Sequence, residues 1–271
     1  MVVAAAAAEQ DVKAASPWVY GDYGQIRLLS SSDGVDESQT VQIGIQMRLR
    51  KGWKTYWRTP GESGIPPHFD WSGSQNVVLS EPAWPTPTRL SEFGAEAFGY
   101  KQEVIFPFMA TRKDLAGGID LDLVMSFGVC LDICVPVTAQ LTLSLPTKGD
   151  PVQRTQQARH IERFIAKVPG ENGAEGLTIA SLRLAGSQEK LAVEVNIDGT
   201  NPMSEPDAVL ELGPEYRQLA PRIVRGKDSA QASVVIPIIM DGEATSLIGQ
   251  NISVVVWDGD GLAVEGVLRV R

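Results

Sequence analysis

Cysteine and histidine are scarce in this chain: its 271 residues include two cysteines, Cys130 and Cys134, and two histidines, His68 and His160. So few ligands argue against a zinc site with four protein ligands. No run approaches 18 consecutive apolar residues, so the sequence predicts no membrane span. Positive charge is also in deficit, because 24 Lys and Arg face 33 Asp and Glu for a net charge of −9. This balance argues against binding to nucleic acids or to anionic membrane surfaces.

What the chain does contain is the pattern of a β protein. It is 43% hydrophobic, with 26 Gly and 17 Pro between many short runs in which apolar and polar residues alternate. Alternation with a period of two is typical of strands that have one buried face. We therefore predict a mostly β protein with two sandwich domains, with strands near 41–49, 76–81, 103–111, 191–197, 208–212, 233–240, 252–257 and 264–270.

One convincing helix divides the two predicted domains. Asp150 is a good N-cap residue and Pro151 suits the first helical position, while Pro169-Gly170 ends the apolar stripe. Small residues before Glu9 are typical either of the remnant of an export signal or of a disordered start. The expected divisions are a disordered N-terminus or signal-peptide remnant at 1–17, a β domain at 18–147, a helical linker at 148–170 and a second β domain at 171–271.

Two stretches of the first domain are expected to be irregular. Residues 52–71 mix aromatic and turn residues and are predicted to form a long connection, and the proline-rich residues 81–90 an extended loop. Five of the six tryptophans precede residue 85, which suits either core packing or a recognition surface. In the second domain, Asp258-Gly-Asp-Gly261 is predicted to be a hairpin turn, because it lacks the other ligand positions of a calcium loop.

Both cysteines lie between two strongly alternating segments, in Ser126-Phe-Gly-Val-Cys-Leu-Asp-Ile-Cys-Val-Pro136. A hairpin with residues 131–133 as its loop places Cys130 opposite Cys134, at a separation close to that of a disulfide. The core-facing apolar residues on both sides are odd-numbered, such as Phe127 and Val135, whereas both cysteines are even-numbered. The alternation therefore predicts that both thiols point away from the core, on the same face of the sheet.

The cysteine pair has three readings. As a structural staple it would be weak, because closing a loop of about five residues contributes about 2 kcal/mol, against about 4.7 kcal/mol for a loop of about 100 residues. A redox-active disulfide is the second reading, and a pair of thiolates that holds Cu(I) is the third. Asp132 lies between the thiols, and no Lys, Arg or His occurs between Arg112 and Lys148. The neighbouring sequence thus does not favour the thiolates, and we expect poor attackers unless a partner activates them.

Four motifs in one order resemble a known family. They are Trp53-Lys-Thr-Tyr-Trp-Arg-Thr-Pro-Gly61, Phe69-Asp-Trp-Ser-Gly73, Phe98-Gly-Tyr100 and Val129-Cys-Leu-Asp-Ile-Cys-Val-Pro136. Together they resemble the amino-terminal periplasmic domain of the DsbD and ScsB thiol:disulfide interchange proteins, over about residues 18–147. Residues 176–271 carry no motif of this kind, although ScsB-like proteins have a comparable second segment.

The resemblance implies a fold and a function. It implies an immunoglobulin-like sandwich whose pair, here Cys130 and Cys134, shuttles between dithiol and disulfide without another cofactor. Electrons would come from a thioredoxin-like domain of a membrane electron transporter and pass to periplasmic thioredoxin-fold proteins such as disulfide isomerases. An aromatic cap loop is implied to shield the pair, with Phe98 as the best match. The other residues expected around the pair are Phe93, Tyr100, Asp132, Tyr56 and Trp57. Asp132, and Glu92 or Glu96 from the cap loop, are expected to tune the thiol pKa or to accept the thiol proton.

This chain departs from the family in two respects. Its cysteine spacing is shorter than in the best-known DsbD domains and closer to the ScsB-like branch, and the membrane and thioredoxin-like parts are absent. We expect either an excised region or a free-standing periplasmic relay. The resemblance favours the downstream Cys134 as the attacking thiol. Two rival functions stay open: a copper-binding or copper-resistance module that uses the same cysteines, and a non-catalytic binding sandwich with a structural disulfide.

Overall fold

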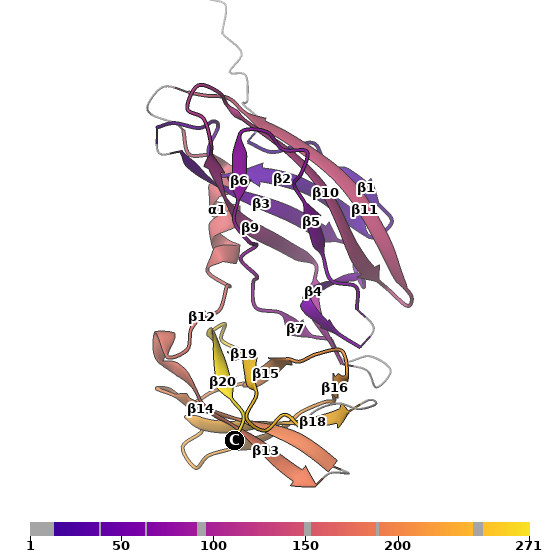
Figure 1. Ribbon diagram of the computed structural model, residues 1–271, viewed down its shortest axis with the longest axis vertical. Coiled ribbons are helices and arrows are strands. Elements are labelled where there is room, and N and C mark those ends of the chain that lie inside the picture. The colour runs from indigo at the N-terminus through magenta and orange to yellow at the C-terminus, as the bar shows by residue number, and fades with distance from the viewer. Residues whose placement is uncertain are drawn as a thin grey trace, which may run out of the picture.

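The computed structural model describes residues 14–37, 39–62, 64–90, 96–148, 153–187, 190–240 and 246–271. Strands dominate these ranges, in which one α-helix, α1 (Gln156–Ile165), and one 3₁₀ turn, η1 (Ala174–Gly176), also occur. The strands form two sandwiches, one above the other in Figure 1. The predicted mostly β fold class is confirmed. Within the described ranges, no helix has the length and apolar character needed to cross a membrane.

The first sandwich packs two antiparallel sheets around one core. Side chains from both sheets fill it, among them Ile43 and Phe106 from one and Leu121 and Leu141 from the other. One sheet has the order β1 (Val19–Gly21), β2 (Gly24–Ser30), β3 (Thr40–Leu49), β9 (Glu103–Arg112) and β6 (Val77–Leu79). The other has the order β11 (Cys134–Leu145), β10 (Ile119–Cys130), β4 (Lys54–Gly61), β8 (Ala97–Lys101) and β7 (Thr88–Arg89), with β5 (His68–Asp70) paired to β10.

Three of these strands correct the expected loops. The segment 52–71 was expected to be a connection, but it holds β4 and β5, and the proline-rich segment holds β7. Turn residues conceal β4, whose pairing with β8 shifts in register between Tyr56 and Gly61. This irregular strand lies in the middle of its sheet, beside β10, and therefore positions whatever chemistry the cysteine hairpin performs.

The helix α1 belongs to the first sandwich and is not a free bridge between the domains. It begins after Thr155, later than Asp150-Pro151, which lie outside the described residues. Ile161 and Phe164 are buried in the first core, against the sheet of β2, β3 and β9. Ile161 comes close because Gly44 has no side chain: a Cβ there would lie 3.0 Å from Ile161 Cγ1. The apolar stripe of the helix thus has a sheet to cover, which a linker would lack.

The N-terminal end of the first sandwich is more ordered than expected. Ser30 donates its backbone N–H to the Ala14 carbonyl, and Ser16 donates to the Leu28 carbonyl. The expectation of disorder for residues 1–17 is therefore wrong for 14–17, because these residues extend the β2 edge of the sheet. Residues 1–13 lie outside the described part of the chain.

The second sandwich also has two sheets around its own core, which includes Val195, Leu210, Val234 and Val254. The turn predicted at Asp258-Gly-Asp-Gly261 joins two of its strands, and Asp258 accepts backbone N–H bonds from Ser204 and Glu205. One sheet has the order β12 (Gly170–Glu171), β20 (Ala263–Arg269), β19 (Asn251–Trp257) and β15 (Asp207–Glu211). The other has β13 (Leu177–Ser187), β14 (Lys190–Gly199), β18 (Gln231–Met240) and β16 (Tyr216–Gln218), with β17 (Arg222–Arg225) paired to β18.

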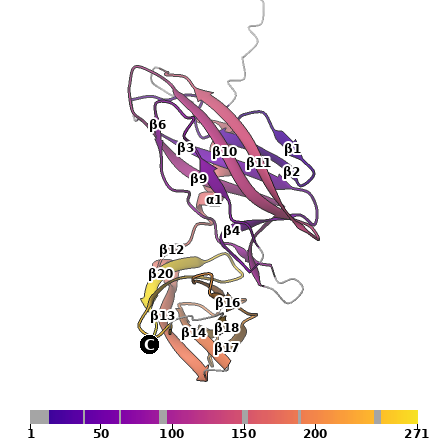
Figure 2. The ribbon, with the colours of Figure 1, turned by 45° about the vertical axis from the view of Figure 1, so that its right-hand side comes forward.

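The two sandwiches meet at the lower end of the first. In both Figure 1 and Figure 2, the strand β4 lies at this junction, above the second sandwich. Val209 of β15 and Val255 of β19 pack with the first core, although they belong to the second sandwich by sequence. The junction is therefore partly apolar, and the cysteine hairpin lies beside the strand that forms it.

Candidate active site

The cysteine hairpin has the predicted register. The strands β10 and β11 pair without a shift from Ile119 opposite Leu145 to Cys130 opposite Cys134, with residues 131–133 as the loop. Both cysteines are free thiols, and the Cys134 thiol donates to Cys130 Sγ over 2.7 Å. Two thiols this close, on directly opposed residues, are placed to form a disulfide after a small adjustment.

The thiols lie on the face of the sheet that points away from the main core. Val129 belongs to the main core, whereas Cys130 belongs to a separate small cluster with Tyr56, Leu90 and Ala97. The direction predicted from the alternation is thus confirmed. Exposure does not follow from it, because this cluster leaves Cys130 only 5% exposed. Cys134 is half-buried at the edge of the same cluster, so the two sulfurs are not equally accessible.

Tyr56 is the polar side chain closest to the pair. Its hydroxyl oxygen lies 2.8 Å from Cys134 Sγ. The ring packs over Gly128 of β10, where a Cβ would lie 3.1 Å from Tyr56 Cδ2. Burial, and then hydrogen bonds to Cys134 and Cys130, raise the pKa of Tyr56 far above its ordinary value. The phenol therefore keeps its proton while thiols ionise, and it can donate that proton in a hydrogen bond to a thiolate.

Opposing influences act on the Cys130 thiol. Burial raises the pKa of Cys130, and so does the neighbouring Cys134, whereas the hydrogen bond of Tyr56 and the charge of Lys54 lower it. The net direction is upward. Lys54 is the β4 residue paired with Cys130, and it is buried. The local sequence around the cysteines shows no cation, but the fold supplies one from β4.

Two residues of the predicted aromatic cap, Phe98 and Tyr100, do not lie over the thiols. Phe98 and Tyr100 pack in the main core, and Tyr100 donates its hydroxyl to the Pro85 carbonyl over 2.8 Å. Because side chains alternate along β8, the residue of this strand that reaches the thiol cluster is Ala97. The expectation for Phe98 and Tyr100 is therefore wrong. Phe93, and Glu92 with it, lies outside the described residues.

The remaining expected residues take other roles. Trp57 is fully buried in the main core, with the Arg58 guanidinium 4.5 Å from its ring centre. Asp132 is exposed in the hairpin loop. Glu96 is buried and pairs with Arg89 over 2.8 Å. Of the residues expected around the pair, Tyr56 alone is brought to the thiols in the described structure, together with Lys54, Leu90 and Ala97, which the sequence did not indicate.

Three apolar side chains of the hairpin face solvent beside Cys134. Leu131 is 41% exposed, Ile133 76% and Val135 44%. Single exposed apolar residues are ordinary, but three on one hairpin tip that also carries a half-buried thiol form a small contact surface. We call these three residues the apolar rim.

Tyr56→Phe tests the role of the hydroxyl. Without it the thiolate loses a hydrogen bond, and a bond to a charged group is worth about 1.5–3 kcal/mol, or roughly one to two pH units. We expect the midpoint of the pH profile for the first alkylation of the reduced pair to rise by about one unit. Alkylation that is quenched at set times and analysed by mass spectrometry measures this midpoint. The rate at the high-pH plateau, where the thiol is fully ionised, separately measures how accessible the sulfur is. Tyr20→Phe, at an exposed tyrosine, is the control; an unshifted midpoint in Tyr56→Phe would contradict the assigned role.

Two adjacent thiols at the end of a β-sandwich, one sheltered and one reachable, suit thiol–disulfide interchange. The comparisons agree: residues 27–146 match the family model described as the N-terminal domain of the thiol:disulfide interchange protein DsbD. The first sandwich is therefore similar to the domain that this family model describes. Residues 167–270 match a family model for a domain of unknown function. A comparison with curated proteins found no match.

A solved structure shares the fold of both sandwiches. It is the crystal structure of the N-terminal periplasmic domain of ScsB from Proteus mirabilis, with 24% sequence identity and a TM-score of 0.73. The match covers 95% of this chain and 98% of that chain. The order of two successive sandwiches is therefore common to the two proteins, since the match runs through nearly all of both.

Proposed function

We propose that this protein is a periplasmic thiol–disulfide relay in which Cys130 and Cys134 alternate between dithiol and disulfide. It takes electrons from a thioredoxin-like domain of a membrane electron transporter and passes them to periplasmic thioredoxin-fold proteins, including disulfide isomerases. The observation that carries the proposal is the contact of two free thiols over 2.7 Å on opposed residues of one hairpin. The periplasmic location rests on the likeness to the ScsB domain. In this proposal the pair itself is the redox group.

The proposed exchange begins at the reachable sulfur. The Cys134 thiolate attacks one sulfur of a partner disulfide, which forms a mixed disulfide and releases the partner's other sulfur as a thiolate. The Cys130 thiolate then attacks Cys134 Sγ, closes the Cys130–Cys134 disulfide and releases the second partner sulfur. The partner gains two electrons and two protons, and the pair loses them. Tyr56 supports the first step, because its hydroxyl lies 2.8 Å from the sulfur that carries the charge.

The surroundings of the pair suit a protein partner better than a small thiol. The apolar rim offers Leu131, Ile133 and Val135 to a docked surface beside Cys134. Burial of Cys130 keeps its sulfur from a docked thiol and leaves it within reach of Cys134. A partner that presents its reactive sulfur on an apolar surface, as a thioredoxin-fold protein does, fits this arrangement. The proposed relay needs one attacking and one resolving thiol, because the mixed disulfide on Cys134 must be resolved by Cys130.

The reduction potential of the pair tests the proposal. We expect a value of roughly −120 to −270 mV, the range of thioredoxin-fold exchange partners. Equilibration with glutathione or dithiothreitol buffers, with thiol labelling as the readout, measures it; a variant with Cys130→Ser shows the labelling of one thiol without the pair. A potential below about −300 mV would identify a structural bond and refute the relay. Binding of Cu(I) by the reduced protein, lost in Cys130→Ser, would support the copper-binding alternative in its place.

A further inference from the structure

The ion pairs between the two sandwiches gather on the two segments that border the thiol cluster. One is β4, which carries Tyr56; the other is the pair of strands β7 and β8, with Leu90 directly after β7 and Ala97 at the start of β8. Among the described residues, the ion pairs between the sandwiches include Arg58 with Glu211 (2.5 Å) and Glu265 (2.8 Å), Arg89 with Asp207 (2.7 Å), and Arg217 with Glu62 (3.5 Å). The second sandwich is thus attached to the walls of the thiol site.

Arg89 makes the most complete of these connections. Its Nε and Nη2 donate to the two carboxylate oxygens of Asp207, over 2.9 and 2.7 Å, and Nη2 also donates to the Ala208 carbonyl over 2.7 Å. Its Nη1 donates to Glu96 over 2.8 Å. A guanidinium with this bidentate geometry holds both carboxylates in fixed places. The side chains of Arg89, Glu96 and Asp207 are 12%, 4% and 18% exposed, so water competes little for these bonds.

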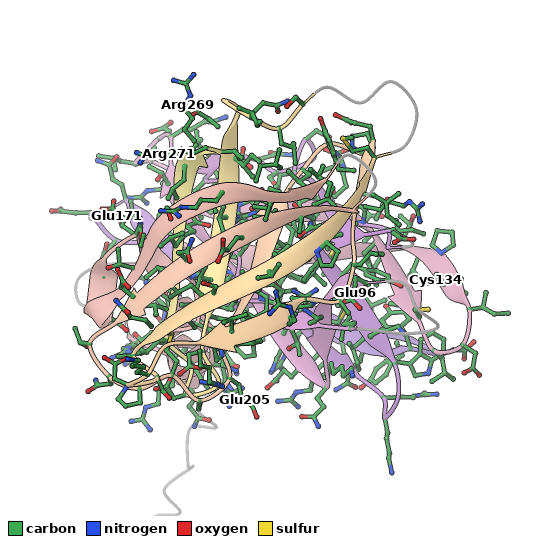
Figure 3. All side chains as sticks on the ribbon, turned by 90° about the horizontal axis from the view of Figure 1, so that it is seen from below. Glu96, Cys134, Glu171, Glu205, Arg269 and Arg271 are labelled. Atoms are coloured by element: carbon green, nitrogen blue, oxygen red, sulfur yellow. The ribbon has the colours of Figure 1, made fainter. Side chains whose placement is uncertain are left out.

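The same guanidinium joins the residues just before the two that shelter Cys130. Arg89 precedes Leu90, and Glu96 precedes Ala97, whose carbonyl accepts the Leu90 N–H over 2.8 Å. Leu90 and Ala97 form the thiol cluster with Cys130 and Tyr56. In Figure 3, which looks at the molecule from below, Glu96 and Cys134 lie toward the same side of the view. The Arg89 bridge therefore holds the residues next to Leu90 and Ala97, the two apolar side chains that pack against the buried sulfur.

We propose that Arg89 is a positioning residue through which the second sandwich keeps Cys130 sheltered. With Asp207 and Glu96 both bound, Leu90 and Ala97 stay in place and only Cys134 is offered to a partner. When the bridge loosens, Cys130 becomes reachable as well, and the two sulfurs are no longer divided into one attacking and one resolving thiol. The effect on exchange rests on the proposed relay. The shelter of Cys130 itself can be measured without any exchange partner.

The test is the alkylation rate of Cys130 in the full chain, in a Cys134→Ser background that leaves one thiol. We expect Asp207→Asn to raise the rate of reaction with iodoacetamide by on the order of tenfold, because one arm of a charge-assisted bridge is weakened and local opening becomes easier. Glu96→Gln, which weakens the other arm inside the first sandwich, is expected to act in the same direction. Rates are compared at equal thiolate fraction, taken from the pH profile of each variant.

The matched control is Glu211→Gln, which weakens the Arg58 bridge between the same two sandwiches and leaves Arg89 intact. Its rate is expected to stay within about twofold of the background. Urea unfolding of each variant separates local opening from a general loss of stability. The proposal is overturned if Asp207→Asn and Glu96→Gln leave the rate unchanged, or if Glu211→Gln raises it equally. A reduction potential typical of a structural disulfide would refute only the proposed relay. It would leave the shelter of Cys130 standing, because the alkylation rate does not depend on thiol exchange with a partner.

Discussion

Cys134→Ser is expected to abolish thiol exchange with thioredoxin-fold proteins. Cys130→Ser is expected to stop the exchange one step later, at the mixed disulfide between Cys134 and the partner. The reason is the unequal access of the two sulfurs: Cys130 is 5% exposed, whereas Cys134 is half-buried and carries the apolar rim beside it. Without Cys134 no sulfur can be reached by a docked disulfide. Without Cys130 the first attack proceeds, but no second thiol lies next to Cys134 to resolve the product.

The measurement uses an oxidised thioredoxin-fold protein as the partner and the reduced variants of this chain. Acid quenching, alkylation of remaining thiols and intact-mass analysis count the covalent complex and the reduced partner over time. Cys130→Ser should accumulate a complex of one to one, while Cys134→Ser should form neither product above the rate of a sample without this protein. A complex that accumulates in Cys134→Ser and is absent in Cys130→Ser would reverse the assigned roles and contradict the proposed first step.

The hairpin could be predicted from the sequence because its information is local. Alternation on both sides of Cys130 and Cys134 fixes the register, and the odd and even positions fix the faces. The second sandwich was accessible to the same argument, since apolar and polar residues alternate along much of β14. Where one face of a strand is buried and the other is not, the pattern of one strand is enough.

The surroundings of the thiols could not be predicted because they come from distant segments. Lys54 and Tyr56 lie on β4, whose aromatic and turn residues conceal its strand character, and their closeness to Cys130 follows only from the pairing of β4 with β10. Phe98 was misplaced for a similar reason. Phe98 and Ala97 are neighbours in sequence, but alternation sends Phe98 into the main core and Ala97 toward the thiols, and the bulkier residue was the wrong choice.

The burial that shelters Cys130 and the thiolate that the redox chemistry needs have opposite effects on the pKa of Cys130. Burial raises the pKa of Cys130 and would slow its attack, while Lys54 and Tyr56 lower it. Since Cys130 has to attack only Cys134 Sγ, which lies 2.7 Å away, proximity compensates for a smaller thiolate fraction. A sheltered resolving thiol is thus compatible with rapid resolution and slow reaction with other thiols.

Trp57→Ala is expected to lower the free energy of unfolding by about 3–5 kcal/mol, the usual range for truncating a buried tryptophan. Trp57 is fully buried, and among the described residues its indole Nε1 has no hydrogen-bond partner, so the loss comes from burial and packing. Urea unfolding measures it. Trp57→Phe, which keeps an aromatic ring in the core, should lose less and serves as the matched variant.

Because Tyr56 is adjacent to Trp57, the same variants test whether the two faces of β4 act independently. Trp57 points into the main core and Tyr56 toward the thiols, so Trp57→Phe should leave the reduction potential and the pH profile of alkylation unchanged, whereas Tyr56→Phe should shift the profile with little effect on stability. If Trp57→Phe moved the pH profile as far as Tyr56→Phe does, the two faces of β4 would not be independent. The thiol chemistry would then depend on the packing of the whole strand, and the role given to the Tyr56 hydroxyl would have to be withdrawn.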